Sequence, residues 1–263
     1  MKTETEPATR EELLRENARL RGDLLTVAHR ISHDLRTPLG GIVNSGEVVR
    51  EMLAENGLPS APLLRPIFDS ADDLTRLIER VSFVLKASAC PRPLEAVKMG
   101  GVVFRVLQRL ERRILEKNAT VCEPPAWPEV RGVFSSLEVV WGNLLLNALQ
   151  HGKGRIELGW QKMDGEFQFW IKDNGGGVAP EQQPGLFQPF HVLHRPDAAG
   201  GLGLSIVQRL MELQGGSCGY QPLLPGGPIF FFTLAVPGEP SGSSPAPASE
   251  KTGGQNILSG IEN

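Results

Sequence analysis

The sequence predicts an α+β protein in which an antiparallel helical hairpin is followed by a sandwich of mixed helices and strands. Two successive stretches with heptad spacing of apolar residues predict the hairpin. A proline-containing segment, residues 90–93, then separates the hairpin from a region in which helical and strand patterns interleave. Interleaved elements of this kind favour an α/β sandwich with the helices on one face of a sheet.

The first helical pattern follows a polar stretch, residues 1–10, which we expect to be disordered. Its seam residues recur at spacings of four and three, and charged residues fill the other positions. Pro38 lies inside this helix and is expected to kink it. The seam consists of Leu13, Asn17, Leu20, Leu24, Val27 and Ile31, and it continues less strictly through Leu35, Ile42 and Val49 to about Leu53.

Turn-forming residues at 56–60 end the first helix, and a second seam with the same spacing follows. Two helices joined by a short loop form an antiparallel hairpin, here assigned to residues 11–90. Because one hairpin buries little apolar surface, we expect two chains to pair as a four-helix bundle, which makes the protein a homodimer. The seams alone fit a generic coiled coil equally well. The second seam consists of Ile67, Ala71, Leu74, Ile78, Val81 and Leu85.

The second domain is expected to span residues 94–238. Asp164-Gly165 is a hairpin signal between two of its strands. Beyond it, the segment 239–263 is rich in Gly, Ser and Pro, and we expect a disordered tail. The patterns predict strands at 94–97, 155–161, 166–172 and 228–236, and helices at 100–117, 136–151 and 203–214.

Composition narrows the class of protein. The hydrophobic fraction of 40% and the charged fraction of 22% are ordinary for a globular protein. The net charge of -3 gives no broad positive field, so nucleic acid is not an expected partner. The three cysteines have no metal-binding spacing and suggest reduced thiols. With no apolar run of roughly 18–20 residues and a polar N-terminus, we expect a cytoplasmic protein without membrane insertion.

The segment Ser32–Leu39 places a histidine and an acid side by side on the first helix. His33 lies two residues after Ile31, about 200° around the helix, so it is expected to face solvent. A neutral imidazole is a good nucleophile, and the Asp34 carboxylate can accept or orient its ring proton. Thr37, one turn further on, is placed to position a water molecule. By itself, an exposed histidine beside an aspartate is also typical of an ordinary surface pair.

Two segments of the second domain have the chemistry of a nucleotide site. Asn143 and Asn147 are four residues apart on one helical face, and amide oxygens suit Mg²⁺. Asp173 directly follows a predicted strand, where its carboxylate can accept a hydrogen bond from the exocyclic amine of adenine. The glycines after it, at 175–177, allow the backbone to approach a ligand. Each segment alone also has an ordinary structural interpretation.

Two further segments complete the set. Leu186–Phe190 supplies apolar anchors in an otherwise irregular stretch, residues 179–199, and long loops of this kind are often lids. Gly200–Leu204 opens a predicted helix, and backbone N–H groups at a helix N-terminus bind phosphate.

These five segments, in this order, resemble the H, N, first glycine, F and second glycine boxes of the sensor histidine kinases of two-component systems. The resemblance covers about residues 20–237 and implies a Bergerat ATP-binding fold for the second domain. It implies autophosphorylation of His33 by ATP, with Asp34 as general base. The phosphoryl group then passes to an aspartate on the receiver domain of a response regulator. In family members that act as phosphatases, the equivalent of Thr37 assists dephosphorylation of that partner.

The resemblance also implies the nucleotide contacts. Asn147 is expected to ligate Mg²⁺, with Asn143 nearby, and Asp173 to contact adenine. The remaining expected contacts, which shape the pocket and its lid, are Gly175, Gly177, Gly201, Leu202 and Gly203.

The chain departs from the family pattern at four places, one of which is the lid, where the basic residues are only His194 and Arg195. Three residues after Asn147 the family usually has a basic residue, and this chain has Gln150. Before the N-box helix, Gly132-Val133 replaces the usual Gly-Asp, so we expect Ser135 or Ser136 to cap that helix. Ala198-Ala199-Gly200 replaces the usual start of the second glycine box.

Two other classes of function stay open at this point. A non-catalytic scaffold would keep the histidine kinase fold without useful turnover, and Gln150 leaves room for it. A serine-kinase anti-sigma factor or a chaperone-like ATPase would share the nucleotide motifs but would not explain an H box on a heptad helix.

The position of the H box near the start of the sequence suggests how a signal arrives. Only about 25 residues precede its helical turn, so we expect no separate sensor domain. The stimulus is then expected to come through an upstream sensor protein or a small signal acting on the helical stem. Asn17 is the polar member of its seam, and such a residue fixes register at a cost in stability.

Overall fold

The computed structural model describes the chain in two compact units, residues 1–92 and residues 93–263, which we treat separately. Of the segments expected to be disordered, 1–9 and 239–263 lie outside the described residues, as does Gly201, whereas Arg10 begins the first helix. The described ranges are 10–56, 61–188, 202–223 and 227–237.

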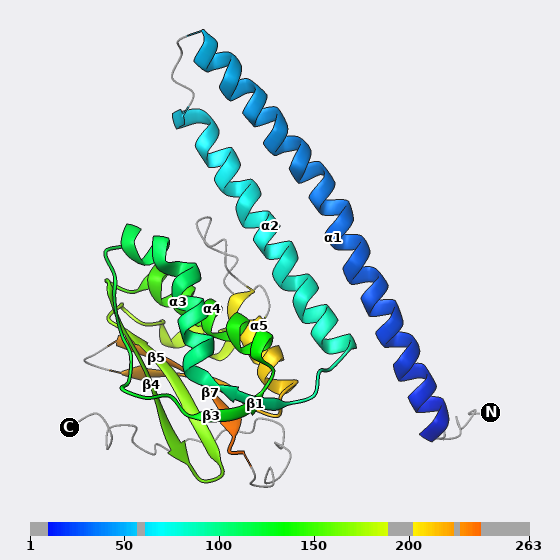
Figure 1. Cartoon of the computed structure of the whole chain (residues 1–263), viewed down its shortest axis with the longest axis vertical. Coiled ribbons are helices and arrows are strands. Elements are labelled where there is room, and N and C mark those ends of the chain that lie inside the picture. Colours follow the sequence, from blue (N-terminus) through cyan, green and yellow to red (C-terminus); the bar gives the residue numbers. More distant parts are fainter. Residues whose placement is uncertain (1–9, 57–60, 189–201, 224–226, 238–263) are drawn as a thin grey trace. The chain divides into compact units, whose positions relative to one another are not determined.

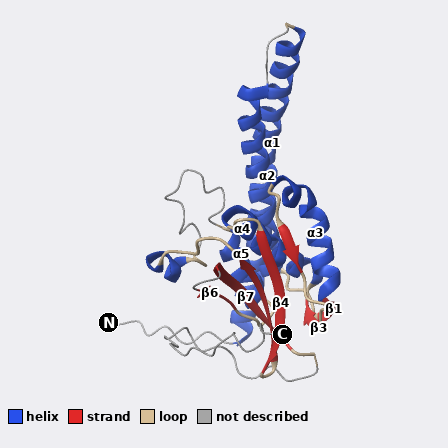
Figure 2. Ribbon diagram, turned by 90° about the vertical axis from the view of Figure 1, so that its left-hand side faces the viewer, coloured by secondary structure: helices blue, strands red, loops and turns tan. Residues whose placement is uncertain are grey.

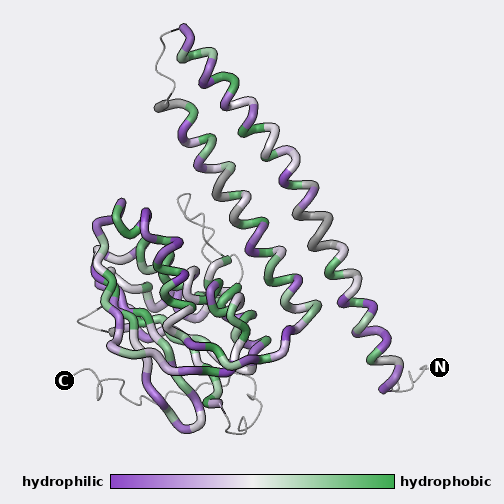
Figure 3. Tube along the Cα trace, viewed as in Figure 1, coloured by the Kyte–Doolittle hydropathy of each residue, from purple (hydrophilic) through white to green (hydrophobic). Residues whose placement is uncertain are grey.

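The first unit is a hairpin of two helices, α1 (Arg10–Glu55) and α2 (Ala61–Ala89) (Figure 1). Helix α1 continues through Pro38, and α2 contains Pro66 in its second turn. In Figure 3, hydrophobic positions recur as separate bands along both helices, as the heptad patterns predict.

The two helices pack against each other through small apolar clusters. Leu39 of α1 and Ala71 and Ile78 of α2 are buried together. Arg36 forms an ion pair with Glu79 across the hairpin, with 3.2 Å between Nη2 and Oε1. Other positions of the predicted seams are not covered within one chain, so one hairpin satisfies only part of its apolar pattern. Leu35, Ile42, Val49, Ile67 and Leu74 are 43–50% exposed.

The second unit is an α/β sandwich. A five-stranded sheet has the order β2-β4-β5-β7-β6, in which β2 is parallel to β4 and the other pairs are antiparallel. A smaller antiparallel pair joins β1 to β3. The elements are β1 (Glu95–Lys98), α3 (Met99–Glu116), β2 (Thr120–Cys122), β3 (Glu129–Gly132), α4 (Phe134–His151), β4 (Arg155–Met163), β5 (Glu166–Asp173), a 3-10 helix η1 (Pro180–Gly185), α5 (Gly203–Glu212), β6 (Cys218–Leu223) and β7 (Gly227–Ala235).

Helices α3, α4 and α5 cover one face of the five-stranded sheet (Figures 1 and 2), and the core lies between the two layers. Trp141 of α4 meets Phe169 of β5 and Phe232 of β7, with ring centroids 6.3 and 5.3 Å apart. All three side chains are fully buried. Large apolar residues at strand spacing on one sheet face and at helical spacing on α4 therefore hold the layers together.

The sequence patterns missed strands β2, β3 and β6 and the 3-10 helix η1, and they placed the start of α4 and the end of α5 two residues late. Strands β2 and β3 have only three and four residues, too few to show an alternating pattern, and β6 was also missed. The expectation that Ser135 or Ser136 caps α4 is wrong. The helix begins at Phe134, its N-cap is Val133, and no side chain of the N-cap residue bonds to the first turn. Both serines therefore lie inside the first turn, where they cannot act as caps.

Within the described residues, no helix combines the length and the apolar character needed to cross a membrane.

Candidate nucleotide site and phosphoacceptor

Helix α4 carries the two asparagines predicted to lie near Mg²⁺. Asn143 is 6% exposed, and its Nδ2 donates a hydrogen bond to the carbonyl oxygen of Val139 at 2.7 Å. Its Oδ1 is buried and has no hydrogen-bond partner among the described residues. A Cβ atom added to Gly203, the first residue of α5, would lie 3.3 Å from that oxygen. The structure therefore brings the N box and the second glycine box together.

Asp173 is the last residue of β5 and is only 2% exposed. Its Oδ1 accepts a hydrogen bond from the backbone N–H of Gly175 at 2.7 Å. Burial raises the pKa of the Asp173 carboxyl, while the Gly175 hydrogen bond and the charge of His151 act in the opposite direction. Asp173 thus presents a desolvated acceptor with one oxygen fixed by the backbone.

Two glycines make room for this carboxylate. A Cβ atom on Gly175 would lie 2.6 Å from Asp173 Oδ1 and 2.5 Å from the carbonyl oxygen of His151. A Cβ atom on Gly152 would lie 3.1 Å from Asp173 Cβ and 2.5 Å from the carbonyl oxygen of Ala148. Gly175 was predicted as a site residue. Gly152 was not, although its position directly after the N-box helix was a usable signal.

Asn174 ties the first glycine motif to the loop after α4. Its Oδ1 accepts hydrogen bonds from the backbone N–H groups of Lys153 and Arg155, at 2.9 and 3.1 Å. Asn143, Asn147 and His151 follow one another at four-residue intervals and so share one face of α4. This face runs from Gly203 at one end to Gly175 at the other, with the half-buried Asn147 between them.

The far side of the first glycine motif also involves Tyr220 and Gly227, which the patterns did not identify. Gly177 has a φ of +72°, a conformation that favours glycine, and the next residue, Val178, donates its N–H to Tyr220 Oη at 2.9 Å. Gly227 begins β7 with a φ of +92°, and an added Cβ there would overlap the carbonyl oxygen of Asp173. The neighbouring Pro225 and Pro228 were a turn signal, but only the sheet shows which residue the turn approaches.

The predicted residues of the second glycine box are only partly described. Leu202 is half-buried and is the N-cap of α5, where its carbonyl oxygen accepts from Ser205 Oγ and from the N–H of Ile206, both at 3.0 Å. From the F box, Leu186 is buried and Phe187 is half-buried, but Pro189 and Phe190 lie outside the described residues.

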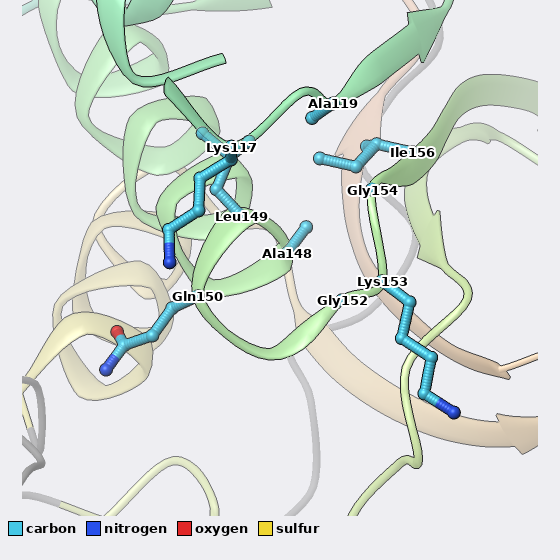
Figure 4. A pocket seen from close by; sticks show the side chains of 9 residues that line it. All are labelled: Lys117, Ala119, Ala148, Leu149, Gln150, Gly152, Lys153, Gly154 and Ile156. Carbon is cyan, nitrogen blue, oxygen red and sulfur yellow. The ribbon is translucent and has the colours of Figure 1, made fainter. Parts of the chain in front are cut away.

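A pocket of about 210 Å³ lies beside this face, at the C-terminal ends of α3 and α4. Figure 4 shows the side chains of Lys117 and Gln150 extending in the same general direction, with Lys153 on the other side of the pocket. Asn143, Asn147 and Asp173 do not line it. The pocket is therefore a neighbour of the predicted nucleotide site, and it places a lysine beside Gln150.

The phosphoacceptor segment lies on α1, in the other unit. His33 is exposed, as its angular position predicts, and Thr37 Oγ1 donates a hydrogen bond to the carbonyl oxygen of His33 at 3.1 Å. The side chain of Asp34 lies outside the described residues. Among the residues that the structure describes, no cluster of three or more His, Cys, Asp or Glu side chains could hold a metal ion.

Comparisons with known proteins agree with this arrangement. Residues 132–238 match the family described as histidine kinase-, DNA gyrase B- and HSP90-like ATPase. The methanogenesis regulatory histidine kinase FilI of Methanothrix harundinacea is 28% identical over 79% of this chain and 24% of its own length. The sensor protein KdpD of Escherichia coli is 30% identical over 83% of this chain and 25% of its own length. The chain thus spans about a quarter of the length of these relatives.

Solved structures give the same result for the fold. The structure of full-length ShkA in complex with AMPPNP matches with a TM-score of 0.62 and 26% identity, over 80% of this chain and 46% of that one. The histidine kinase AdeS of Acinetobacter baumannii matches with a TM-score of 0.52 and 21% identity, over 78% of this chain and 98% of that one.

The fold of the second unit, with its N and glycine motifs on facing elements, is therefore of the α+β Bergerat type. Within the wider ATPase family, the chain contains a histidine kinase catalytic domain.

Proposed function

We propose that this protein is an ATP-dependent histidine autokinase. It phosphorylates His33 and donates the phosphoryl group to an aspartate on the receiver domain of a response regulator. Residues 11–90 form the dimerisation and phosphotransfer hairpin, and residues 94–238 form the catalytic ATP-binding domain. Because ATP is the phosphoryl donor, the reaction belongs to the cytoplasm. The similarity to known histidine kinases and the residues of the two units support these assignments.

The observation that carries the proposal is the buried carboxylate of Asp173. Burying a carboxylate at 2% exposure costs stability, and its pKa stays raised although the Gly175 hydrogen bond and the charge of His151 oppose the effect of burial, so a structural role alone does not account for it. Gly175 fixes one of its oxygens, and the other is free to accept a hydrogen bond from the exocyclic amine of adenine. The absence of side chains at Gly175 and Gly152 leaves room around Oδ1 of this carboxylate.

The residues on α4 fit a bound Mg²⁺. Asn147 is half-buried on the face that joins the two glycine boxes, and its amide oxygen is a ligand type that Mg²⁺ accepts. The buried Oδ1 of Asn143, one turn earlier, has no hydrogen-bond partner in the described part of the chain and is oriented by the bond from Nδ2 to Val139. Asn147 would hold the ion and Asn143 would lie nearby. The ion would neutralise charge on the ATP phosphates.

The chemistry at His33 is a phosphoryl transfer. One imidazole nitrogen attacks the γ-phosphorus of ATP, the new N–P bond forms, and the bond from that phosphorus to the β,γ-bridging oxygen breaks. ADP leaves with the electron pair of that bond. Asp34 accepts the proton that the ring gives up. His33 is exposed on α1, so the nucleophile is accessible.

The hairpin also suggests a second activity, dephosphorylation of the response regulator, and a segment on which an upstream signal would act. Thr37 lies one turn from His33, and its hydroxyl, already bonded to the His33 carbonyl, keeps acceptor lone pairs that can orient a water for dephosphorylation of the response regulator. An upstream sensor protein would act on the part of α1 that precedes His33. In that part of α1, the exposed Asn17 interrupts the apolar seam and the exposed Leu20 continues it.

Incubation with γ-labelled ATP and Mg²⁺ tests the proposal. The wild-type chain is expected to gain an acid-labile, alkali-stable label, and His33→Gln is expected to lose it while still binding nucleotide. His29→Gln is the matched control, because it removes an imidazole one turn earlier on the same helix. Labelling of His33→Gln at the wild-type rate would overturn the assignment of the phosphoacceptor.

Gln150 favours one alternative, a scaffold that keeps the fold without useful turnover. In that case wild-type protein would bind ATP in the same titration but gain no label. An acid-stable label on serine would instead indicate a serine kinase of the wider ATPase family.

A further inference from the structure

Gln214 connects two helices of the catalytic domain. It lies just beyond the end of α5 and is 7% exposed. Its Oε1 accepts a hydrogen bond from the backbone N–H of Val133 at 2.7 Å, and its Nε2 donates to the carbonyl oxygen of Leu210 at 2.9 Å. Both ends of a buried amide are thus bonded, one to α5 itself and one to the start of α4.

The bond from Val133 to Gln214 satisfies one N–H at the start of α4, a helix whose N-cap side chain makes no hydrogen bond. Val133 is the N-cap residue, and its side chain has no atom that can accept a hydrogen bond. Its N–H is one of the four at the helix start that have no partner within the helix. A residue 81 positions away in the chain satisfies it.

The preceding residue leaves room for this contact. A Cβ atom on Gly132 would lie 3.1 Å from Gln214 Oε1 and 2.9 Å from Leu137 Cδ1. Any side chain at position 132 would therefore press against the acceptor oxygen. Gly132, Val133 and Gln214 together form one close junction between β3, α4 and α5.

The opposite end of α5 approaches the nucleotide site. Gly203 begins the helix, and a Cβ atom there would lie 3.3 Å from Asn143 Oδ1. Helix α5 therefore meets α4 at both of its ends. A ten-residue helix is about 15 Å long, so Gln214 and Gly203 lie near opposite ends of one continuous element.

We propose that Gln214 is a positioning residue for nucleotide binding. It holds α5 at the position along α4 at which the helix N-terminus meets Asn143. This inference rests on the proposed function only in assigning the Asn143 face to a nucleotide. This role of Gln214 goes beyond stabilising the start of α4, because its side chain also joins α4 to α5, and both helices must face the nucleotide.

Mg²⁺-ATP titration of the full chain, together with thermal unfolding without nucleotide, tests the inference. Gln214→Met keeps the length of the side chain but removes the acceptor, so ATP affinity is expected to fall about five- to tenfold and the unfolding temperature to fall as well. Gln208→Met is the matched control, since Gln208 is exposed on the same helix. It should change neither quantity.

A double variant separates positioning from capping. Val133→Asp gives α4 an N-cap side chain that accepts hydrogen bonds from N–H groups of the first turn. This offsets the lost stability without restoring the contact with α5, so Gln214→Met combined with Val133→Asp is expected to regain thermal stability but not ATP affinity. Recovery of both would show that Gln214 is only a cap and would overturn the proposal. So would wild-type affinity in Gln214→Met.

Two further outcomes are distinguishable. If the wild-type chain binds no ATP, the proposed function fails rather than the role of Gln214. If Gln214→Met does not fold, Gly132→Ala offers a second route, because its methyl group would press on Oε1. Weakened ATP binding in a folded Gly132→Ala protein supports the proposal, and unchanged binding overturns it.

Discussion

The backbone N–H of Gly175 donates a hydrogen bond to Asp173 Oδ1 at 2.7 Å, and the same oxygen lies 2.6 Å from the point where a Cβ atom on Gly175 would stand. Glycine at 175 is thus both the donor that fixes the carboxylate and the residue whose lack of a side chain lets it come so close. The carbonyl oxygen of His151, 2.5 Å from the same point, closes the remaining side.

This contact predicts a difference between adjacent glycines. Gly175→Ala places a methyl group against two backbone-anchored atoms, so it is expected to destabilise the domain by about 1–3 kcal/mol and to weaken ATP binding. Gly176→Ala is the matched control, because nothing lies within 4 Å of its added Cβ. Thermal unfolding and ATP titration of both variants check the prediction. Equal effects of the two substitutions would contradict the packing around Asp173.

Asp173→Asn is expected to change binding and stability in opposite directions. Loss of the charged acceptor should weaken adenine nucleotides by roughly 1–3 kcal/mol. Without nucleotide, the same substitution removes a buried charge whose pKa is raised by desolvation, so the unfolding temperature at pH 8 is expected to rise. Unchanged ATP affinity would remove Asp173 from the site, whatever the effect on stability.

The raised pKa of Asp173 also predicts a pH dependence. A raised carboxyl pKa contributes stability that is full below the pKa of the unfolded chain and is lost as pH rises through the folded pKa. The pH dependence of ATP binding has the opposite sign, because the ionised carboxylate is the form that accepts the hydrogen bond. ATP affinity should therefore fall as pH decreases through the raised pKa, and Asp173→Asn should flatten that part of the titration. The charge of the neighbouring His151 acts on the pKa of Asp173, so His151→Gln serves as the control.

The three cysteines should differ in reactivity. Burial raises the pKa of the Cys218 thiol to about 12, with a smaller effect from Glu212, whereas Cys90 and Cys122 are exposed. In the native chain at pH 7.5, iodoacetamide is expected to modify Cys90 and Cys122 and to leave Cys218 intact, as measured by peptide mass spectrometry. Rapid native modification of Cys218 would show that β6 is not packed as described.

The apolar positions that α1 leaves open predict a dimer. Ile42 is 50% exposed in the single hairpin although it belongs to the heptad seam, so Ile42→Glu should dissociate a four-helix bundle into folded monomers. Asn44→Glu adds the same charge at an exposed position outside the seam and is the control. Light scattering of the full chain and of fragment 11–88 measures the mass. A wild-type monomer at micromolar concentration would contradict the bundle.

Sequence patterns predicted an element correctly where the residues that form it lie close together in the sequence. Heptad spacing marked both helices of the hairpin, and the Asp164-Gly165 turn marked the β4–β5 hairpin, because both signals depend on residues a few positions apart. The cap of α4 failed for the opposite reason. The partner of Val133 is Gln214, which no local pattern connects to it.

By itself, the sequence determined the chemical types and the order of the motifs, namely His33 with Asp34 on a heptad helix, the two asparagines, and Asp173 before its glycines. These are properties of short segments, and their periodicity sets which face each residue occupies. Only the tertiary structure decided that Gly152, Gly203 and Gly227 approach Asp173 or Asn143, and that Gln214 joins α5 to α4. Those contacts arise when the sheet and the three helices pack, since packing brings together atoms far apart in the chain and fixes which backbone needs a residue without a side chain.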